Sequence, residues 1–456
     1  MGKQLGLLII MIVILTGCQS AGVTPDLFEE GNSSLLASWT IEVSNSPSLT
    51  ETPGLDVDEI PSPTPDFLPP SLSPSPEAHP TQLAFTYQAL PDLKSGKYVS
   101  IQQIKMATTE KGWAIGGQND EFHYILFSLD GGRSWQDRTP PILVPSEFQR
   151  NIDNIIAHFY DENTAWVLID ITKDSLNDSN YLVWRTKDSG LTWIPSDPLP
   201  FPLGQIYANP GGFSFITPEI GWLWVQTELS HMHDFSYLFS TRDGGANWKL
   251  INRPGNSMIE VYLNTGMAFA NENDGWVTKD SLGGGLGPFI EQTRDGGKTW
   301  EVIFLPHPDG NSWEENPQSC QTIKPTFTSS LTGLLLAQCF LYDADNQSFN
   351  MDNPSTYIFA TSDWGESWQA AVLPSPVDEL VFIDFLTGFA LGKDHYQSNN
   401  GGADWTRIKT VTWQGQFSFI SAKEGWAVAR RDGDIALVHT IDGGLIYQTI
   451  TPIVIP

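Results

Sequence analysis

Short runs in which apolar and polar residues alternate recur along the chain from residue 99 onward, and each ends at a turn-forming group. Examples are "VSIQQIKM" at 99–106, "GFSFIT" at 212–217 and "QFSFIS" at 416–421. Alternation of this kind is typical of a half-buried β-strand. No run of helical periodicity interrupts the series. The pattern therefore predicts an all-β chain of short strands.

A second element follows these runs, in which a turn leads into an apolar strand that usually opens with Gly-Trp. It occurs seven times, as "EKGWAIGG", "NTAWVLI", "EIGWLWV", "NDGWVTK", "LTGLLLA", "LTGFALG" and "KEGWAVA". Each copy is interpreted as a turn followed by a short aromatic or aliphatic strand. The repetition indicates an array of similar sheets.

A third element is a polar, glycine-rich turn that ends in tryptophan, first seen in "FSLDGGRSWQD" at 127–137. It recurs as "RTKDSGLTW", "STRDGGANW", "QTRDGGKTW" and "ATSDWGESW", with two degenerate copies that have Asn400 for Asp and Tyr447 for Trp. The carboxylate can accept hydrogen bonds from the turn, the glycine allows backbone angles that other residues resist, and the tryptophan can bury its ring beside the hairpin. We expect a structural role for these residues: Asp130, Trp135, Asp188, Trp193, Asp243, Trp248, Asp295, Trp300, Asp363 and Trp368.

The seven copies are spaced by 37 to 68 residues, enough for four short strands in each unit. Repeats of four-stranded sheets at this period are typical of a β-propeller. The sequence thus predicts an all-β, seven-bladed propeller over residues 83–456, with the third motif in the turn between the third and fourth strands of each blade.

The residues before 83 have a different composition. Residues 1–17 combine Lys3 with an apolar run from Leu5 to Leu15, which is too short to span a bilayer and indicates a signal peptide. Residues 18–82 contain 11 prolines and no lysine or arginine, and such a segment buries too little apolar surface to fold. We expect a disordered tether there.

The motifs resemble those of known families. The ending "LTGC" resembles the bacterial lipobox, which implies that Cys18 is acylated and anchors the protein on the outer side of a bacterial cytoplasmic membrane or cell envelope. The third motif resembles the Asp box (BNR repeat) of sialidases, sortilin-type receptors and xyloglucanases, and is called the Asp box below. The coupled rhythm of "KGWAIGG" and "DGGRSW" is most similar to the photosystem II stability and assembly factor family, whose members are seven-bladed propellers. That family docks through an arginine-rich patch, whereas this chain has a net charge of −29.

Charge and residue spacing exclude several kinds of chemistry. The acidic balance disfavours nucleic acid. A sialidase needs an arginine ahead of the first Asp box, and none occurs before Arg133. In "SHMHDF", the imidazoles of His231 and His233 could converge on a metal beside Asp234, but we favour a solvated loop. The stretch "DADN", with Asp343 and Asp345, resembles the start of a calcium loop but lacks the later Gly and the bidentate Glu. We expect neither a metal nor a cofactor.

Long insertions are expected on one face of the propeller. They lie in the second turns of blades and in the connections between blades, opposite the Asp boxes, and length variation of this kind often accompanies binding. Neutral drift of exposed loops would produce the same variation. The candidate partner-binding residues are His231, His233, Asp234, Phe235, Trp313, Asp343 and Asp345.

Cys320 and Cys339 are the two cysteines after Cys18. Their midpoint falls in "FTSSLTG", which we interpret as the turn of a hairpin, so the two residues would lie opposite each other. The sequence therefore predicts a disulfide, with two free buried thiols as the alternative.

These features together favour a monomeric, non-enzymatic surface lipoprotein that binds a protein or glycan partner and touches the membrane only through the lipid on Cys18. A photosystem II assembly factor and a glycan-acting hydrolase are the alternatives.

Overall fold

Antiparallel β-sheets of short strands make up the fold. The computed structural model describes residues 85–88, 90–119, 121–145, 152–171, 181–201, 208–230, 233–255, 263–281, 287–310, 312–313, 318–327, 332–343, 348–350 and 354–456. Within these ranges the chain forms strands and turns but no α-helix, which confirms the all-β prediction for this part. Cys18 and the rest of residues 1–84 lie outside the described residues.

The first three four-strand units follow the chain in order. They are β2 (Ser100–Met106), β3 (Gly112–Gln118), β4 (Glu121–Ser128) and β5 (Ser134–Asp137), then β7 (Ile152–Phe159), β8 (Ala165–Ile171), β9 (Val183–Thr186) and β10 (Ile194–Pro195), and then β11 (Ala208–Phe215), β12 (Gly221–Ser230), β13 (His233–Thr241) and β14 (Lys249–Asn252). A separate pair is formed by β1 (Phe85–Gln88) and β6 (Ile142–Pro145).

A nine-stranded sheet follows, which contains β15 (Leu263–Phe269), β16 (Gly275–Asp280), β17 (Phe289–Thr293), β18 (Glu301–Phe304), β19 (Gln318–Phe327), β20 (Gly333–Asp343), β21 (Ser348–Phe349), β22 (Ser355–Thr361) and β23 (Gln369–Leu373). Its two halves, β15–β18 and β19–β23, are joined where Asp280 of β16 pairs with Gln321 of β19. The last two sheets are β24 (Val377–Phe382), β25 (Gly388–Gly392), β26 (Asp394–Ser398) and β27 (Thr406–Thr410), and β28 (Gln414–Phe419), β29 (Gly425–Arg431), β30 (Asp434–Thr440) and β31 (Gln448–Ile450).

Burial falls from the second strand of each sheet to the fourth. All but the last residue of β3 and every residue of β25 are buried, whereas the fourth strands β18, β27 and β31 are half-buried or exposed along their length. A second strand is covered on both faces because its sheet packs between two neighbouring sheets. This is why its sequence is continuously apolar instead of alternating.

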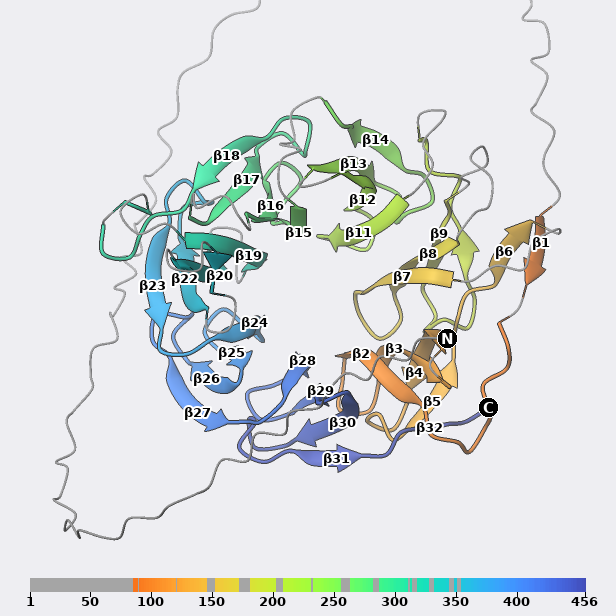
Figure 1. Cartoon of the computed structure of the whole chain (residues 1–456). Helices are drawn as coiled ribbons and strands as arrows, with labels where there is room; N and C mark the ends of the chain where they lie inside the picture. Colours follow the sequence, from red (N-terminus) through yellow and green to blue (C-terminus); the bar gives the residue numbers. More distant parts are fainter. Residues whose placement is uncertain are drawn as a thin grey trace, which may run out of the picture. The chain divides into compact units, whose positions relative to one another are not determined.

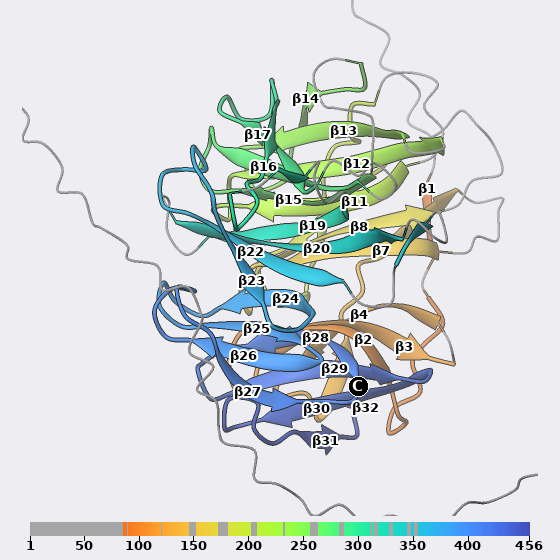
Figure 2. The same cartoon turned by 60° about the vertical axis from the view of Figure 1, so that its left-hand side comes forward.

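The hydrophobic core is divided among the contacts between neighbouring sheets. Each core cluster combines side chains of two adjacent four-strand units, and the cluster with Met106, Trp135, Trp426 and Leu437 unites the first unit with the last. The first strands also meet in the order β7, β11, β15, β19, β24, β28 and β2 (Figure 1). In the view of Figure 2, the β24–β27 sheet stacks on the β28–β31 sheet. These contacts define a β-propeller.

A strand from the carboxyl-terminal part of the chain closes the ring. Strand β32 (Ile453–Val454) pairs in parallel with β5 as a fifth strand of the first sheet (Figure 1). Backbone N–H groups of Ile453 and Ile455 donate to the carbonyls of Arg133 (3.1 Å) and Trp135 (2.8 Å). On its other side, the Val454 N–H donates to the Lys97 carbonyl at 2.9 Å. The first sheet is therefore built from both ends of the described chain.

Candidate functional site

The Asp boxes are turns held together by their own carboxylates. In the first box, Asp130 Oδ1 accepts hydrogen bonds from the backbone N–H groups of Arg133 (3.1 Å) and Ser134 (2.8 Å), and Oδ2 accepts from Ser134 Oγ (2.6 Å). Burial raises the pKa of Asp130, but the hydrogen bonds from Ser134, Ser128 and Arg133 outweigh it and hold the pKa below its usual value. The φ angle of Gly132 is +87°, a conformation that favours glycine.

The same arrangement recurs in the other intact boxes, where the aspartates accept equivalent hydrogen bonds and the tryptophans lie beside the turn. These residues are Asp188 with Trp193, Asp243 with Trp248, Asp295 with Trp300 and Asp363 with Trp368. Trp135 itself is fully buried, and its indole N–H donates to the Gly132 carbonyl at 2.9 Å. The boxes are thus engaged in local folding.

The tryptophans of the second strands join neighbouring sheets, a role that the sequence analysis did not predict. The indole N–H groups of Trp166 and Trp222 donate to the carbonyls of Gly244 (2.8 Å) and Gly296 (3.1 Å), which are glycines in the Asp box of the next sheet. Trp426 donates likewise to Gly131 in the first sheet, at 3.0 Å. The Asp boxes of the third, fourth and first sheets therefore each receive a hydrogen bond from a tryptophan of the sheet before them.

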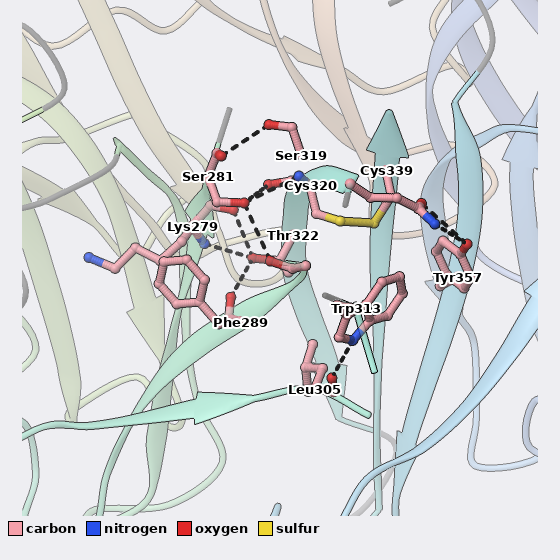
Figure 3. The surroundings of a disulfide bond; sticks show 12 residues. Lys279, Ser281, Phe289, Leu305, Trp313, Ser319, Cys320, Thr322, Cys339 and Tyr357 are labelled. Atoms are coloured by element: carbon pink, nitrogen blue, oxygen red, sulfur yellow. Dashed lines mark hydrogen bonds between the residues drawn. A yellow bond between two sulfur atoms is a disulfide. The ribbon is translucent and has the colours of Figure 1, made fainter. Parts of the chain in front are cut away.

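Cys320 and Cys339 form a disulfide that crosses the β19–β20 hairpin (Figure 3), and the two residues face each other in its register. Hydrogen bonds link the same strand to the sheet before it. Ser281 Oγ donates to the Cys320 carbonyl at 2.8 Å, and Thr322 Oγ1 donates to the Lys279 carbonyl at 3.0 Å. The disulfide thus lies where the two halves of the nine-stranded sheet meet.

The expectation that Trp313 contacts a partner is wrong. The ring is only 8% exposed and its N–H donates to the Leu305 carbonyl at 2.9 Å. It packs edge-on against Tyr357 (Figure 3), with ring centroids 5.3 Å apart, and against His307, at 4.6 Å. Trp313 therefore anchors the segment between β18 and β19 to the hydrophobic core.

The remaining candidate partner-binding residues lie in or beside the long insertions. His231 and Asp345 are outside the described residues. His233, Asp234 and Phe235 begin strand β13, and their side chains are not described. Asp343 ends β20, opposite Ser348 of β21, and is half-buried. Next to it, Leu341 and Tyr342 are each 46% exposed.

A pocket of about 700 Å³ opens between the β24–β27 and β28–β31 sheets. Three turns line it: Lys393 between β25 and β26, Thr412 and Trp413 between β27 and β28, and the Asp432–Gly433 turn between β29 and β30. Because the Asp boxes join third and fourth strands, turns between second and third strands lie on the opposite face. The pocket therefore shares its face with the long insertions, and its volume is in the range of small-ligand sites.

Charged and aromatic groups meet in this pocket. Its walls carry the cations Lys393, Arg430 and Arg431 and the carboxylates Asp432 and Asp434. The ring of Trp413 is half-buried, and Gln414 beside it is exposed. No residue of the pocket was among the predicted partner-binding residues. The available signals were an Arg-Arg pair before Asp-Gly in an acidic chain, and a tryptophan outside every repeated motif.

The first strands of four units carry titratable groups that interact with one another. They are Lys105 in β2, His158 in β7, Lys324 in β19 and Glu379 in β24. Burial raises the pKa of Glu379 to about 7, against the opposing effects of the Phe417 N–H, which donates to its Oε2 at 3.0 Å, and of Lys105.

The two lysines and the histidine are shifted in the direction that favours their neutral forms. Burial lowers the pKa of Lys324, and the charge of Lys105 lowers it further. Both lysine residues are exposed at the surface. The strands around them still reduce the hydration of their ammonium groups, and this partial desolvation lowers the pKa of both lysines. Burial, with Lys324 and Lys105, lowers the pKa of His158 to about 3, so this imidazole is neutral at physiological pH.

Two kinds of site do not occur in the part of the chain that the structure describes. No three His, Cys, Asp or Glu side chains are grouped there so that they could hold a metal ion. Nor does that part contain a helix with the length and apolar character of a membrane span.

The strands and their contacts define a β-propeller, and a pocket lined by charged and aromatic residues lies on the face opposite its Asp boxes. No family model and no curated protein matches the chain. Among solved structures it is similar to YCF48 bound to a D1 peptide, at 14% identity and a TM-score of 0.44, over 79% of this chain and 98% of that one. It is also similar to the polysaccharide lyase Uly1 (12% identity, TM-score 0.46, 81% and 94%) and to the Penicillium chrysogenum α-L-arabinanase complexed with arabinobiose (14%, 0.38, 61% and 90%).

Proposed function

We propose that this protein is a lipid-anchored, seven-bladed β-propeller that binds a protein or glycan partner outside a bacterial membrane and does not act on it as an enzyme. Seven blades result when the nine-stranded sheet is counted as two. The anchor is Cys18 at the end of "LTGC", and the tether of residues 18–82 holds the propeller away from the membrane surface.

The observation that carries the binding role is the pocket between the last two sheets. Its turns present charged groups and an aromatic ring on the face that also carries the insertions. The carboxylates of the Asp boxes on the other face are instead engaged within their own turns, as Asp130 and Asp295 illustrate. Binding is therefore assigned to the insertion-bearing face.

Site-specific photocrosslinking in the native envelope tests this assignment. A benzophenone amino acid at Thr412, an exposed residue of the pocket, should crosslink to the partner, whereas the same group at the exposed Leu445 of the last box should not. Crosslinks from Leu445 alone, or from neither position, would contradict the proposal. In parallel, Cys18→Ser should remove lipid labelling and release the protein from the membrane fraction.

The two alternatives predict different outcomes of further experiments. A photosystem II assembly factor should crosslink from the same pocket to a reaction-centre subunit in a photosynthetic host. A glycan-acting hydrolase should release new sugar ends from polysaccharides incubated with the full-length protein. Crosslinking without such release supports the binding role.

A further inference from the structure

The pocket between the β24–β27 and β28–β31 sheets is a local exception to the charge of the molecule. The chain has 53 acidic residues and 24 lysines and arginines. The lining of this pocket nevertheless has three cations, Lys393, Arg430 and Arg431, against the two carboxylates of Asp432 and Asp434. Cations brought together in an acidic protein attract a negatively charged group from solution. The pocket is therefore suited to an anion.

The Arg431 guanidinium is held before any ligand arrives, because its Nη1 donates to Thr412 Oγ1 at 3.3 Å and its Nε lies 3.8 Å from Asp432 Oδ2. The Arg430 guanidinium instead donates to the carbonyl of Gln102 in the first sheet, on the other side of the β28–β31 sheet. The turn after them is tight, because Asp432 and Gly433 both have positive φ angles, of 53° and 90°, as in a type I′ hairpin. Fixed donors lose little entropy when a ligand binds, and paired arginine N–H groups match the two oxygens of a carboxylate.

Trp413 supplies a flat apolar surface whose orientation is set by its neighbours. Its ring packs against Tyr447, Phe417 and His395, with centroids 5.3, 5.7 and 5.8 Å away, and the last of these is fully buried. The part of the ring that lines the pocket can cover the C–H face of a sugar ring.

The pocket also contains acceptors beside its cations. Asp432, Asp434 and Gln414 offer oxygens that can accept hydrogen bonds from hydroxyl groups. An acidic peptide would bring further carboxylates against the two aspartates, whereas a sugar acid brings one carboxylate and several hydroxyls. This mixture of groups distinguishes the two ligands.

We propose that the pocket binds an acidic saccharide, with its carboxylate on Arg431 and Lys393, one sugar face on Trp413 and its hydroxyls on Asp432, Asp434 and Gln414. This assignment rests on the proposed binding function and names the ligand class for it.

Calorimetric titration of the full-length protein in detergent tests the assignment, with trigalacturonate as the acidic probe and its methyl ester as the neutral one. The wild type should bind the acid at least about tenfold more tightly than the ester. Arg431→Gln, at an exposed position, should remove most of that preference, and Lys393→Gln should reduce it. Arg242→Gln on the box face changes the charge equally and should leave binding unchanged.

Trp413→Ala should weaken the acid and the ester together, because the sugar face is common to both. Because this ring also packs on the core, thermal unfolding of Trp413→Ala is measured first. Its binding is then compared with that of the wild type at a temperature at which both proteins are folded. Equal binding of acid and ester, or a preference that survives Arg431→Gln, would overturn the assignment. Binding of tetraglutamate in place of trigalacturonate would also overturn the assignment of an acidic saccharide. The proposed binding function is tested separately, and it fails only when crosslinking from Thr412 fails.

Discussion

Single tryptophans of the second strands lie buried at the contacts between neighbouring sheets. Trp166 and Trp276 occupy the same place in strands β8 and β16, and both are fully buried. Trp166 donates its indole N–H to the Gly244 carbonyl at 2.8 Å, while the N–H of Trp276 has no acceptor among the described residues. The two residues therefore differ in one interaction within similar apolar surroundings.

Trp166→Phe should lower the free energy of unfolding by about 1–2 kcal/mol more than Trp276→Phe. Both changes remove similar buried area, but only the first leaves a buried carbonyl, that of Gly244, without its donor. Urea unfolding of the two variants measures the difference. Equal losses would mean that the inter-sheet hydrogen bond contributes nothing.

Glu379 makes stability depend on pH near neutrality. Its pKa is raised from 4.5 to about 7 in the folded state, so the folded protein retains a proton that the unfolded chain releases. The stability gained in this way is complete below about pH 4.5 and is lost as the pH rises through 7. Lys105, Asp378 and the Phe417 N–H are the groups that act on this carboxyl.

Glu379→Gln should therefore become more stable relative to the wild type between pH 5 and pH 8.5, by up to about 3 kcal/mol. The glutamine remains neutral and keeps an oxygen for the Phe417 N–H. Urea unfolding at both pH values measures the change, and Glu301→Gln on the exposed strand β18 is the control. A constant difference between variant and wild type across this range would contradict the shifted pKa.

The β19–β20 hairpin shows what an element's sequence can specify. Cys320 and Cys339 are placed symmetrically about the turn in "FTSSLTG", and the structure pairs them in register. A register shift between Ile323 and Thr326 lies nearer the turn and leaves the cysteine pair aligned. Local symmetry about one turn was therefore enough to find this contact.

Replacing both cysteines with serine should lower the free energy of unfolding by about 3 kcal/mol, because the bond closes a loop between residues 19 apart in sequence. Chemical unfolding of the oxidised protein and of the double variant measures this loss. A non-reduced digest should contain the two linked peptides, and recovery of two alkylatable thiols from envelope-purified protein would contradict the bond.

The Asp boxes were equally predictable, because each depends on residues within one turn. The pocket was not, because its walls come from three turns centred near residues 393, 412 and 432, and no motif links them. The acceptors of Trp166 and Trp222 were also hidden, since they belong to the next sheet and only the packing of sheets identifies them. Trp313 was misjudged because an aromatic residue in a connection can equally anchor it to the core.

At the scale of the whole molecule, the short strand β32 adds backbone pairing to the contact between the last sheet and the first. Five backbone hydrogen bonds connect residues 452–455 to the first sheet and the segment before it, and Val454 is buried. The sequence "TPIVIP" follows the last Asp box and resembles a simple tail, so its place in the first sheet could not be predicted. Closure of the ring pairs segments from the two ends of the described chain, so the sequence of a single repeat does not predict it.

Deleting residues 452–456 should lower the free energy of unfolding by an amount on the order of 5 kcal/mol, from the lost backbone hydrogen bonds and the burial of Val454. Deleting Pro456 alone removes one hydrogen bond, which the Gln136 side chain donates to the Pro456 carbonyl, and should change the free energy of unfolding little. Urea unfolding compares the two. Similar stability of both variants would show that contacts between the sheets close the ring without β32.

Strand β32 also imposes an order on assembly. It follows every other described strand along the chain, yet its partner β5 belongs to the first sheet. When the chain emerges amino end first, from a ribosome or through a membrane, this edge of β5 therefore stays unpaired until residues 453–454 have emerged. An open strand edge invites pairing with other chains. A product that stops short of residue 453 would keep that edge exposed, so the finished ring distinguishes chains that contain β32 from chains that lack it.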